Sequence, residues 1–437
     1  MSHKTNRRNF LKGTAAAGVG YWAAGGVALA QSDSPNERLQ FACCGIGGKG
    51  SSDSADAAKN GDVVAACDID AKRLEGAGKR FKGAKLYYDY RKMLEENEDK
   101  IDAVTVSTPD HCHAVVTAMA IKMGKHCFVQ KPLTHSIYEA RVLGELTAKH
   151  KVATQMGNQG TANAGLRKAA ALIKAGALGT VKEVHVWSNR PIWPQGGDRP
   201  AEEPVPDHVH WNEFLGPAPL RPYGKGYHPF SWRGWWDFGT GALGDMACHT
   251  VNMPYAGLDM RDPTSVVAET SGHNEDSYPK WSIIDFEFPA NDWRPGFKFR
   301  WQDGGKRPDK ELLGGRNVPG SGCLIIGDKG KMFSPDDYAS NYELFDGAEE
   351  KDVEFTSSPG HFAEWIRAIR GGEPAMSNFK DYAGPLTETI LLGNLAVWAA
   401  AKGKGKKVDW DAKKMVAKGS PEVDHIIRPK YREGYSL

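Results

Sequence analysis

The sequence lacks features that would point to several classes of protein. Its 437 residues carry a formal charge of only +2, so there is no basic excess to predict a nucleic-acid partner. Seven cysteines cannot all pair, and without a C-x-x-C or H-E-x-x-H motif no metal site is predicted. There is no internal repeat and no low-complexity tract. Ordinary proportions of hydrophobic (40%) and charged (25%) residues remain, and the length predicts a soluble globular protein of two domains.

The first 30 residues have the features of an export signal. Arg7 and Arg8 are paired, a weakly apolar run of glycine and alanine follows, and Ala28 and Ala30 form an A-x-A cleavage site. This pattern resembles a twin-arginine signal, which predicts the twin-arginine export machinery as a partner, cleavage after Ala30 and a periplasmic location. About 18 residues are marginal for a span, so no stable membrane insertion is expected after cleavage; an uncleaved anchor is the alternative.

Export by this route would change the net charge of the chain and would explain its unpaired cysteines. The leader contains four cations and no acid, so removing it changes the formal charge from +2 to about −2. A chain that folds in the reducing cytoplasm before export needs no disulfides. Cys43, Cys44, Cys67 and Cys127 lie in apolar, strand-like runs. We therefore expect them to be small buried hydrophobic side chains.

Residues 39–70 predict a dinucleotide-binding βαβ unit around which the chain is organised. An apolar run ends in G-x-G-x-x-G, and a second apolar run ends in an acid. Gly45 would allow the tight turn, Gly47 the approach of backbone N–H groups to a pyrophosphate, and Gly50 close packing of helix on sheet. Asp68 stands near the roughly 20-residue spacing expected for an acid that binds the ribose hydroxyls.

The acid favours NAD over NADP, because a 2′-phosphate would meet a carboxylate. Arg73 follows closely and leaves NADP open. A glycine turn that binds nothing is the alternative reading. Ile46 and Gly48 complete the loop and are included in the predicted cofactor site.

Strands and helices alternate from residue 36 to 158, which predicts a Rossmann domain with a mostly parallel sheet. Ligands of such sheets bind at the carboxyl ends of the strands. The expected cofactor-binding residues at these ends are Thr108, Pro109, His111, His113, Gln130, Lys131 and Asn158.

Residues 159–402 have a different pattern and predict an α/β domain with a mainly antiparallel sheet. Its expected strands are residues 181–187, 265–269, 283–288, 297–301, 323–327 and 331–333, and helices are expected at residues 162–174, 361–370 and 386–402. An irregular stretch at residues 191–234 is long enough to be functional or interface-forming. Residues 403–437 are expected to be a charged tail.

Three clusters could carry chemistry. His111 and His113 form an H-x-H turn that either caps a helix or lines the nicotinamide side of a pocket. Lys131 would stand at the mouth of the cofactor cleft, suited to exchange a proton with a substrate hydroxyl, or be an ordinary surface lysine. Asp245 and His249 are one helical turn apart, so the carboxylate could orient the imidazole and stabilise its protonated form; a purely structural helix would look similar.

Aromatic residues precede the third cluster. Trp232, Arg233 and Trp235 offer ring faces and a fork of donors that suit a hydroxyl-rich sugar ring. A tryptophan cluster of this kind could equally be part of a core.

Taken together, these motifs resemble those of the Gfo/Idh/MocA family. The segments that carry the likeness are the glycine loop, Cys67-Asp68, Tyr88-Asp-Tyr-Arg, Val106 to His113, Gly124 to Pro132 and Gly244-Asp245-x-x-x-His249. The resemblance implies a Rossmann domain followed by an α/β domain with a large, open-faced sheet that often builds dimers and tetramers. It also implies oxidation of a ring hydroxyl by NAD(P), with Lys131, Asp245 and His249 as catalytic residues. Gln130 replaces the family's usual glutamate, so Lys131 loses a carboxylate neighbour.

The resulting hypothesis is an exported, NAD(P)-dependent oxidoreductase of a sugar, glycoside or cyclic polyol. Because free NAD is scarce outside the cytoplasm, the cofactor should be tightly bound and regenerated on a second substrate, and a homodimer or homotetramer is expected. One rival is glycoside cleavage through transient oxidation with bound NAD. Another is a non-catalytic sugar- or cofactor-binding protein.

Overall fold

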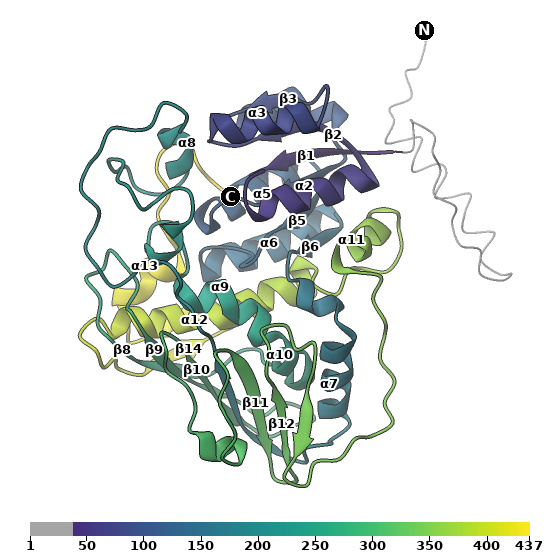
Figure 1. The fold of residues 1–437 in the computed structure, drawn as a ribbon, viewed down its shortest axis with the longest axis vertical. Coiled ribbons are helices and arrows are strands. Elements are labelled where there is room, and N and C mark those ends of the chain that lie inside the picture. Colours follow the sequence, from purple (N-terminus) through teal and green to yellow (C-terminus); the bar gives the residue numbers. More distant parts are fainter. Residues whose placement is uncertain (1–37) are drawn as a thin grey trace, which may run out of the picture.

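The computed structural model describes residues 38–437, which fold into two layered units (Figure 1). The predicted leader, residues 1–30, lies outside the described residues. Within residues 38–437 no helix combines the length and apolar character needed to cross a membrane.

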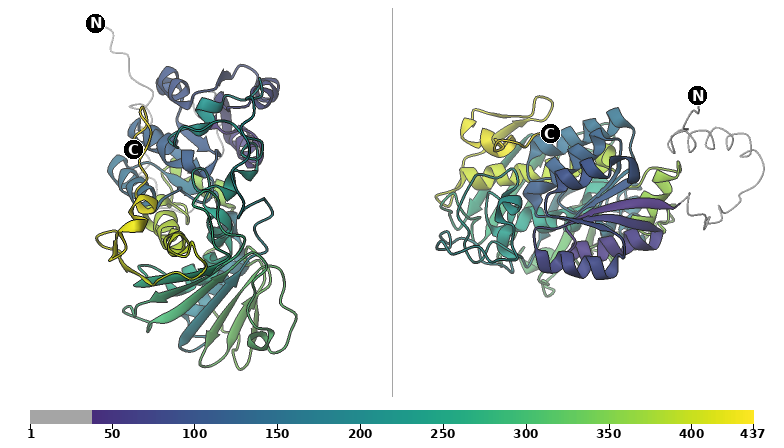
Figure 2. Two further views of the ribbon diagram at one scale, coloured as in Figure 1. Left: turned by 90° about the vertical axis from the view of Figure 1, so that its left-hand side faces the viewer. Right: turned by 90° about the horizontal axis from the view of Figure 1, so that it is seen from above.

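The first unit is a six-stranded sheet with strand order β3-β2-β1-β4-β5-β6, in which every pair of neighbours is parallel. Helices lie on both of its faces (Figures 1 and 2). Its elements are β1 (Leu39–Cys44), α2 (Lys49–Asn60), β2 (Gly61–Cys67), α3 (Ala71–Arg80), β3 (Lys85–Tyr87), α4 (Tyr90–Glu96), β4 (Ala103–Val106), α5 (Asp110–Lys122), β5 (His126–Val129), α6 (Ile137–His150) and β6 (Thr154–Met156). This order reverses between β1 and β4, and the crevice at such a point is where nucleotides bind.

Apolar strands form this sheet because both of its faces are covered. The strand β4 is buried at every residue, and so are the last four residues of β1. All seven cysteines are unpaired and buried, as expected for a chain without disulfides. Burial raises the pKa of the Cys43 thiol to about 12, so this side chain behaves as a small hydrophobic residue.

The second unit is a nine-stranded sheet with strand order β13-β12-β11-β7-β10-β9-β8-β14-β15. Only β10 and β7 pair in parallel; the other neighbours are antiparallel. Its strands are β7 (Val181–Trp187), β8 (Ser265–Thr270), β9 (Ser282–Phe288), β10 (Phe297–Gln302), β11 (Gly322–Gly327), β12 (Lys331–Ser334), β13 (Glu343–Phe345), β14 (Val408–Asp411) and β15 (Val416–Lys418). The predicted fold class, a Rossmann domain plus an α/β domain with a mainly antiparallel sheet, is confirmed.

Helices cover one face of the large sheet and leave the other open (Figure 2). The helices of this half are α7 (Ala164–Lys174), α8 (Trp211–Leu215), α9 (Gly241–Thr250), α10 (Asn252–Leu258), α11 (His361–Ile369), α12 (Gly384–Ala399) and α13 (Asp424–Ile427). In β10 buried Phe297 and Phe299 alternate with exposed Lys298 and Arg300, which matches one covered and one solvated face. On the open face Arg300 pairs with Asp285.

The expected charged tail contains more structure than the sequence predicts. The strands β14 and β15 extend the large sheet beyond β8. They form because Val408 and Trp410 of β14 and Ala417 of β15 are buried and pack on the core, while Asp409 and Lys418 are exposed. Each run is only three or four residues long and lies among lysines, so its two-residue periodicity is too brief to recognise in the sequence.

Candidate active site

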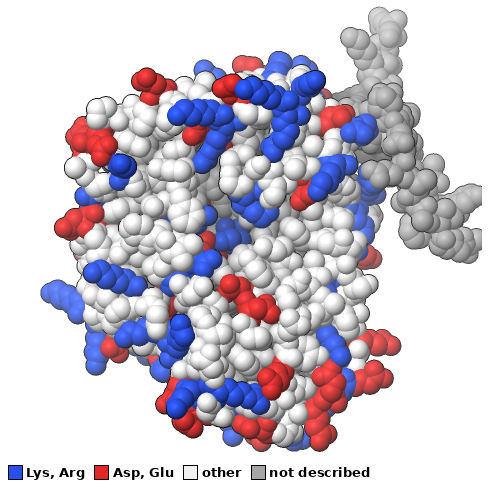
Figure 3. Space-filling model, in the orientation of Figure 1, with Lys and Arg blue, Asp and Glu red and all other residues white. Residues whose placement is uncertain are grey.

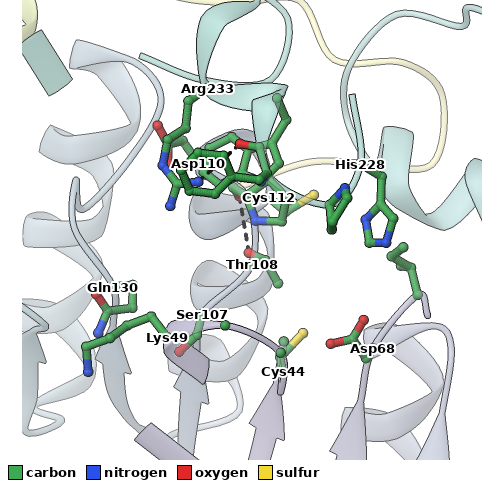
Figure 4. Close-up of a pocket in the computed structure, with 18 of the residues that line it drawn as sticks. Cys44, Lys49, Asp68, Ser107, Thr108, Asp110, Cys112, Gln130, His228 and Arg233 are labelled. Carbon is green, nitrogen blue, oxygen red and sulfur yellow. Dashed lines mark hydrogen bonds between the residues drawn. The ribbon is translucent and has the colours of Figure 1, made fainter. Parts of the chain in front are cut away.

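A cavity of about 420 Å³ lies between the two units, at the carboxyl ends of β1, β2, β4 and β5 and beside α9. Figure 4 shows Asp68 and His228 on one side of it and Gln130 and Arg233 on the other. The sequence-predicted residues that line it are Gly45, Gly47, Gly48, Asp68, Arg73, Thr108, Pro109, Gln130, Lys131, Trp232, Arg233, Asp245 and His249. The structure therefore brings the predicted catalytic residues and most of the predicted cofactor residues into one space.

The glycine loop has the close approaches that the sequence predicts for a dinucleotide cradle. Gly45 adopts φ +76°, and a Cβ atom there would lie 2.5 Å from the Ser107 carbonyl oxygen. A Cβ atom on Gly50 would lie 2.0 Å from the Gly45 carbonyl oxygen. Only glycine permits this packing, which brings the amino end of α2 to the edge of the cavity, where it can hold phosphate groups.

Asp68 stands beside this loop and is almost fully buried. One carboxylate oxygen accepts a hydrogen bond from the Ile46 amide (2.9 Å) and the other from the Asp70 amide (3.0 Å). Burial raises the pKa of Asp68, and Arg73, 4.0 Å away, opposes that rise. The acid and the arginine therefore share the end of the cavity where an adenosine ribose would lie.

Three predicted cofactor residues lie outside the cavity, and two of them support the glycine loop. Ile46 contributes its amide to Asp68, and Gly50 contributes the close packing of α2. Asn158 is fully buried, and its side-chain oxygen accepts a hydrogen bond from Asn252 (3.1 Å). None of the three is among the residues that line the cavity.

Gln130 is explained by a buried carboxylate on α2. Its side-chain amide donates to Asp53 (2.9 Å), which also accepts from the Ser107 hydroxyl (2.7 Å) and pairs with Lys49 (2.5 Å). Asp53 is 1% exposed. A glutamate at position 130 would place a second negative charge against this carboxylate, so glutamine is the residue that fits here.

We expect Gln130→Glu to destabilise the protein, because two carboxylates in one buried site cannot both ionise. The free energy of unfolding should fall by about 1–3 kcal/mol at neutral pH, and less at a pH low enough to protonate one of the two carboxylates. Urea unfolding at both pH values measures this. Gln130→Met, which removes the hydrogen bond without adding charge, is the control, and an equal loss in both variants would contradict the explanation.

His111 and His113 do not line the cavity, contrary to the prediction. Both imidazoles are buried. The ring nitrogens of His113 meet the carbonyls of Thr108 and Pro132 at 2.8 Å, and those of His111 meet the carbonyls of Phe214 (2.8 Å) and Phe238 (3.1 Å). Burial lowers the pKa of both rings, to about 3 for His111 and about 4 for His113. They hold backbone segments in place, including the one that follows Lys131.

Lys131 lies where the sequence places it, at the end of β5, and its charge is met from α9. Its Nζ atom donates to the Asp245 carboxylate and to the Asp245 main-chain carbonyl, each at 2.7 Å. Burial alone would raise the pKa of Asp245, but the charges of Lys131 and Arg233 more than offset this and lower it to about 2. Asp245 is thus the carboxylate neighbour of Lys131 that Gln130 does not supply.

His249 lies one turn further along α9, but Asp245 does not hold it as the sequence predicts. Among the described residues no group hydrogen-bonds its Nδ1 atom, which is buried. Burial and the nearby charge of Lys131 lower the pKa of His249 to about 3, against the opposing charge of Asp245. The imidazole is therefore neutral at physiological pH, not stabilised as a cation, and it packs edge-on against Tyr338 at 4.9 Å.

Sequence reasoning missed two further residues at this end. Arg190 follows β7, and its Nε atom lies 3.7 Å from the second carboxylate oxygen of Asp245. Tyr338, from the loop after β12, lines the cavity beside His249. No local motif marks either of them, because each reaches the cavity only through the pairing of distant strands.

Residues 205–230 of the long connection between β7 and α9 cross back to the Rossmann domain, and we call them the strap. The Ala71 amide donates to the His208 carbonyl, and the His210 amide donates to the Ile69 carbonyl, both at 2.8 Å. The strap thereby pairs with the three residues that follow Asp68. Trp235, predicted to bind substrate, instead packs in a small buried cluster at the base of this connection, with Phe214, Tyr227, Trp232 and Phe238.

The C-terminal segment holds the strap from outside. Arg432 donates to the carbonyls of Gly216 (2.7 Å) and Asn212 (2.8 Å) and to the Asn212 side chain (2.8 Å). Tyr435 then lines the cavity, with Arg91 over its ring at 4.8 Å. The adenosine end of the cavity is therefore covered by two segments remote in sequence.

Comparison with known proteins places the chain in a family. The model of an oxidoreductase family with an NAD-binding Rossmann fold (GFO_IDH_MocA) matches residues 39–158, and the model of that family's C-terminal alpha/beta domain matches residues 163–437. A glycosyl hydrolase family 109 protein of Solibacter usitatus is 30% identical over 170 residues, which are 34% of this chain and 38% of that protein. Inositol 2-dehydrogenase of Salmonella typhimurium is 29% identical over 126 residues, 28% of this chain and 37% of that enzyme. The chain thus spans less than two fifths of these two relatives.

Solved structures resemble it over most of its length. The WlbA dehydrogenase of Bordetella pertussis, in complex with NADH and UDP-GlcNAcA, superimposes with a TM-score of 0.61 at 18% identity, covering 86% of this chain and 99% of that one. An inositol dehydrogenase homolog of Azotobacter vinelandii, with NADH and myo-inositol, gives 0.57 at 16% identity, covering 85% and 98%. At these identities the likeness establishes the fold. Since the two family models together match nearly all of residues 39–437, the chain belongs to the Gfo/Idh/MocA oxidoreductase family, and its first domain is an NAD-binding Rossmann fold.

Proposed function

We propose that the chain is an NAD-dependent oxidoreductase of a ring hydroxyl in a sugar, glycoside or cyclic polyol. The observation that carries this proposal is one cavity lined both by the glycine loop and by Lys131, Asp245 and His249. A binding module has no need of an amine and a neutral imidazole in the same cavity as its nucleotide loop. The inositol dehydrogenase homolog with bound NADH and myo-inositol supports a polyol or sugar as the substrate class.

The residues present fit a dinucleotide. The cradle at Gly45 and Gly50 would hold the pyrophosphate, and Asp68 the ribose hydroxyls. When bound, NAD accepts or donates a hydride at its nicotinamide ring. We propose NAD as the cofactor, because the Asp68 carboxylate would repel the 2′-phosphate of NADP. Arg73 lies 4.0 Å from Asp68 and could pair with such a phosphate, so a competition experiment should compare NAD with NADP.

Side chains of the cavity would transfer the proton of the substrate hydroxyl. In the oxidation direction His249 or Lys131 takes up the hydroxyl proton, and the other of the two side chains hydrogen-bonds the same oxygen. Asp245 holds the amine in place through the two 2.7 Å bonds and offsets its charge. Asp245 is therefore assigned to positioning Lys131, where the sequence suggested that it orients His249.

Mass spectrometry of the purified protein for bound dinucleotide, followed by addition of sugars and cyclitols while nicotinamide absorbance is recorded, tests the proposal. Bound NAD that is reduced by at least one of these compounds is the expected result. A protein that contains no dinucleotide and binds none when it is supplied would refute it.

A second candidate is glycoside cleavage through transient oxidation at one ring carbon. It is favoured by the matched segment shared with the glycosyl hydrolase family 109 protein. Oxidation at one carbon acidifies the neighbouring C–H bond, so that a glycosidic substituent can be eliminated without net redox change. Product analysis separates the two functions: a ketone accumulates in the first, and a released aglycone in the second.

We further propose that the cofactor is held tightly, because the strap and the C-terminal segment cover its adenosine end. Replacing Arg432 by alanine removes three hydrogen bonds to the strap and is expected to speed release of NADH about tenfold. Stopped-flow displacement of NADH, followed by its fluorescence, measures the rate. Arg428→Ala is the matched control, since Arg428 lies in the same segment but stacks on Tyr138 at 4.0 Å. Equal release rates in both variants would contradict the role of the strap.

We also propose that the protein is periplasmic and forms a homo-oligomer. The leader supports export in the folded state to the periplasm, where a retained cofactor and a second substrate for its regeneration are needed. The open face of the large sheet supports a homodimer or homotetramer.

A further inference from the structure

The end of the cavity lined by Lys131, Asp245 and His249, which we call the reactive end, has an excess of positive charge. Three cations, Lys131, Arg190 and Arg233, line it, and the Nε atoms of the two arginines lie 3.7 Å and 3.2 Å from the single carboxylate of Asp245. That carboxylate is already bonded to Lys131 at 2.7 Å. Counting these groups alone, two positive charges are not neutralised.

Asp110 is the other carboxylate that lines the cavity near these cations. Burial raises its pKa to about 6, opposed by a hydrogen bond from Thr240 and by the charges of Arg233 and Lys131. With the Asp110 carboxylate counted as ionised, one positive charge remains over the whole group. An unpaired charge that faces a partly desolvated cavity costs free energy unless a ligand of opposite charge binds beside it.

The hydrogen-bonding groups at the reactive end also favour an anionic ligand. Guanidinium and ammonium groups donate only, whereas each sugar hydroxyl must both donate and accept. Of the acceptors here, the Asp245 Oδ1 atom already accepts from Lys131 (2.7 Å) and Arg233 (3.2 Å), and the Asp110 carboxylate accepts from Thr240 (2.7 Å). A site so rich in donors is matched by a ligand group that only accepts, which is what a carboxylate does.

Arg233 is also held ready for such a group. Its guanidinium stacks on the rings of Trp232 (4.2 Å) and Phe230 (4.8 Å), and Nη1 donates to the Phe230 carbonyl (3.2 Å). Figure 4 shows it reaching into the cavity near Asp110, and Figure 3 shows blue Lys and Arg atoms in the hollow near the middle of this face. A planar fork fixed in this way loses little entropy when it binds a planar anion.

We propose that the substrate carries a carboxylate on its sugar ring, as a hexuronate does, and that Arg190 and Arg233 bind this group at the reactive end. The inference rests on the proposed function and narrows it from sugars and polyols in general to acidic sugars. A single negative charge matches the single excess positive charge, so a carboxylate fits better than a doubly charged phosphate ester. Arg190 and Arg233 are then the residues that set specificity for the charge of the substrate.

The test compares matched ligands on the NADH-loaded protein. Dissociation constants are measured by calorimetry for glucuronate, galacturonate and mannuronate, for the corresponding neutral hexoses and for the hexose 6-phosphates. At least one uronate should bind about tenfold or more tightly than its neutral partner, since a charge-assisted hydrogen bond contributes about 1.5–3 kcal/mol. Raising the salt concentration should weaken uronate binding and leave hexose binding unchanged.

Variants localise the effect. Arg190→Gln and Arg233→Gln should each reduce the preference for the uronate to less than about threefold, whereas Lys79→Gln, which breaks a surface ion pair with Glu75 on α3, should preserve it. Equal binding of the hexose and the uronate in every matched pair, a hexose 6-phosphate that binds more tightly than every uronate, or no binding of any uronate would overturn the inference. Each of these results leaves the proposed function standing as long as NAD is bound and a neutral sugar reduces it; loss of NAD binding would remove both.

Discussion

Replacing Lys131 by methionine is expected to lower the turnover number for oxidation of the sugar by about 10²–10⁴-fold while NAD stays bound. Methionine keeps most of the length and apolar character of the side chain but removes the amine that donates to Asp245 at 2.7 Å. Without it, no cation stands at the end of β5 to hydrogen-bond the reacting oxygen. Arg190 and Arg233 still neutralise Asp245, so the fold of α9 should survive.

Steady-state kinetics and NADH binding, measured on the same preparation, separate chemistry from affinity. The matched control is Lys79→Met, which removes a surface lysine that pairs with Glu75 and does not line the cavity, and it should leave both quantities unchanged. Partial recovery of Lys131→Met by added methylamine would assign the loss to the missing amine. Full turnover in Lys131→Met would show that the lysine has only a structural role.

The second large effect is expected from Gly50→Ala. Its Cβ atom would lie 2.0 Å from the Gly45 carbonyl oxygen and 2.8 Å from the carbonyl carbon, so the glycine loop must move away from α2. Overpacking of this kind costs about 1–3 kcal/mol, and because the displaced atoms are those that hold the pyrophosphate, NAD affinity should fall about 10–100-fold. Calorimetric titration with NADH measures the change.

Gly76→Ala provides the control for a glycine-to-alanine change in a helix of the same domain. A Cβ atom at Gly76, in α3, meets nothing within 4 Å. Alanine is a better helix former than glycine by about 1 kcal/mol, so this variant should be no less stable than the parent and should bind NADH normally. If Gly50→Ala also bound NADH normally, the cradle would not be the pyrophosphate site.

The nucleotide end of the site could be predicted from sequence because its residues are close together in the chain and each has a distinct mechanical task. Gly45, Gly50 and Asp68 fall within one βαβ unit, whose local pattern is long and periodic. Lys131 and Asp245 could be placed because each follows or lies within a recognisable element. Their direct contact, made between residues 114 positions apart, is a property of the packed domains alone.

The remainder depends on long-range packing. Arg190 and Tyr338 reach the cavity from the end of β7 and from the loop after β12, which are aligned only when β7, β11 and β12 form one sheet. An H-x-H turn says nothing about which way its rings face, and for His111 and His113 the backbone carbonyls around them decide it. The strap likewise pairs with residues 69–71 across more than 130 positions of sequence.

We propose that this cavity transfers hydride between a sugar carbon and a nucleotide held by the glycine loop. Incubating the NAD-loaded protein with a substrate whose ring carbons all carry deuterium, and then measuring the mass of the recovered nucleotide, tests it most directly. We expect one deuterium in the reduced nicotinamide ring with the parent protein and almost none with Lys131→Met. Recovery of reduced nucleotide without deuterium, or of labelled nucleotide in equal amount from both proteins, would contradict it.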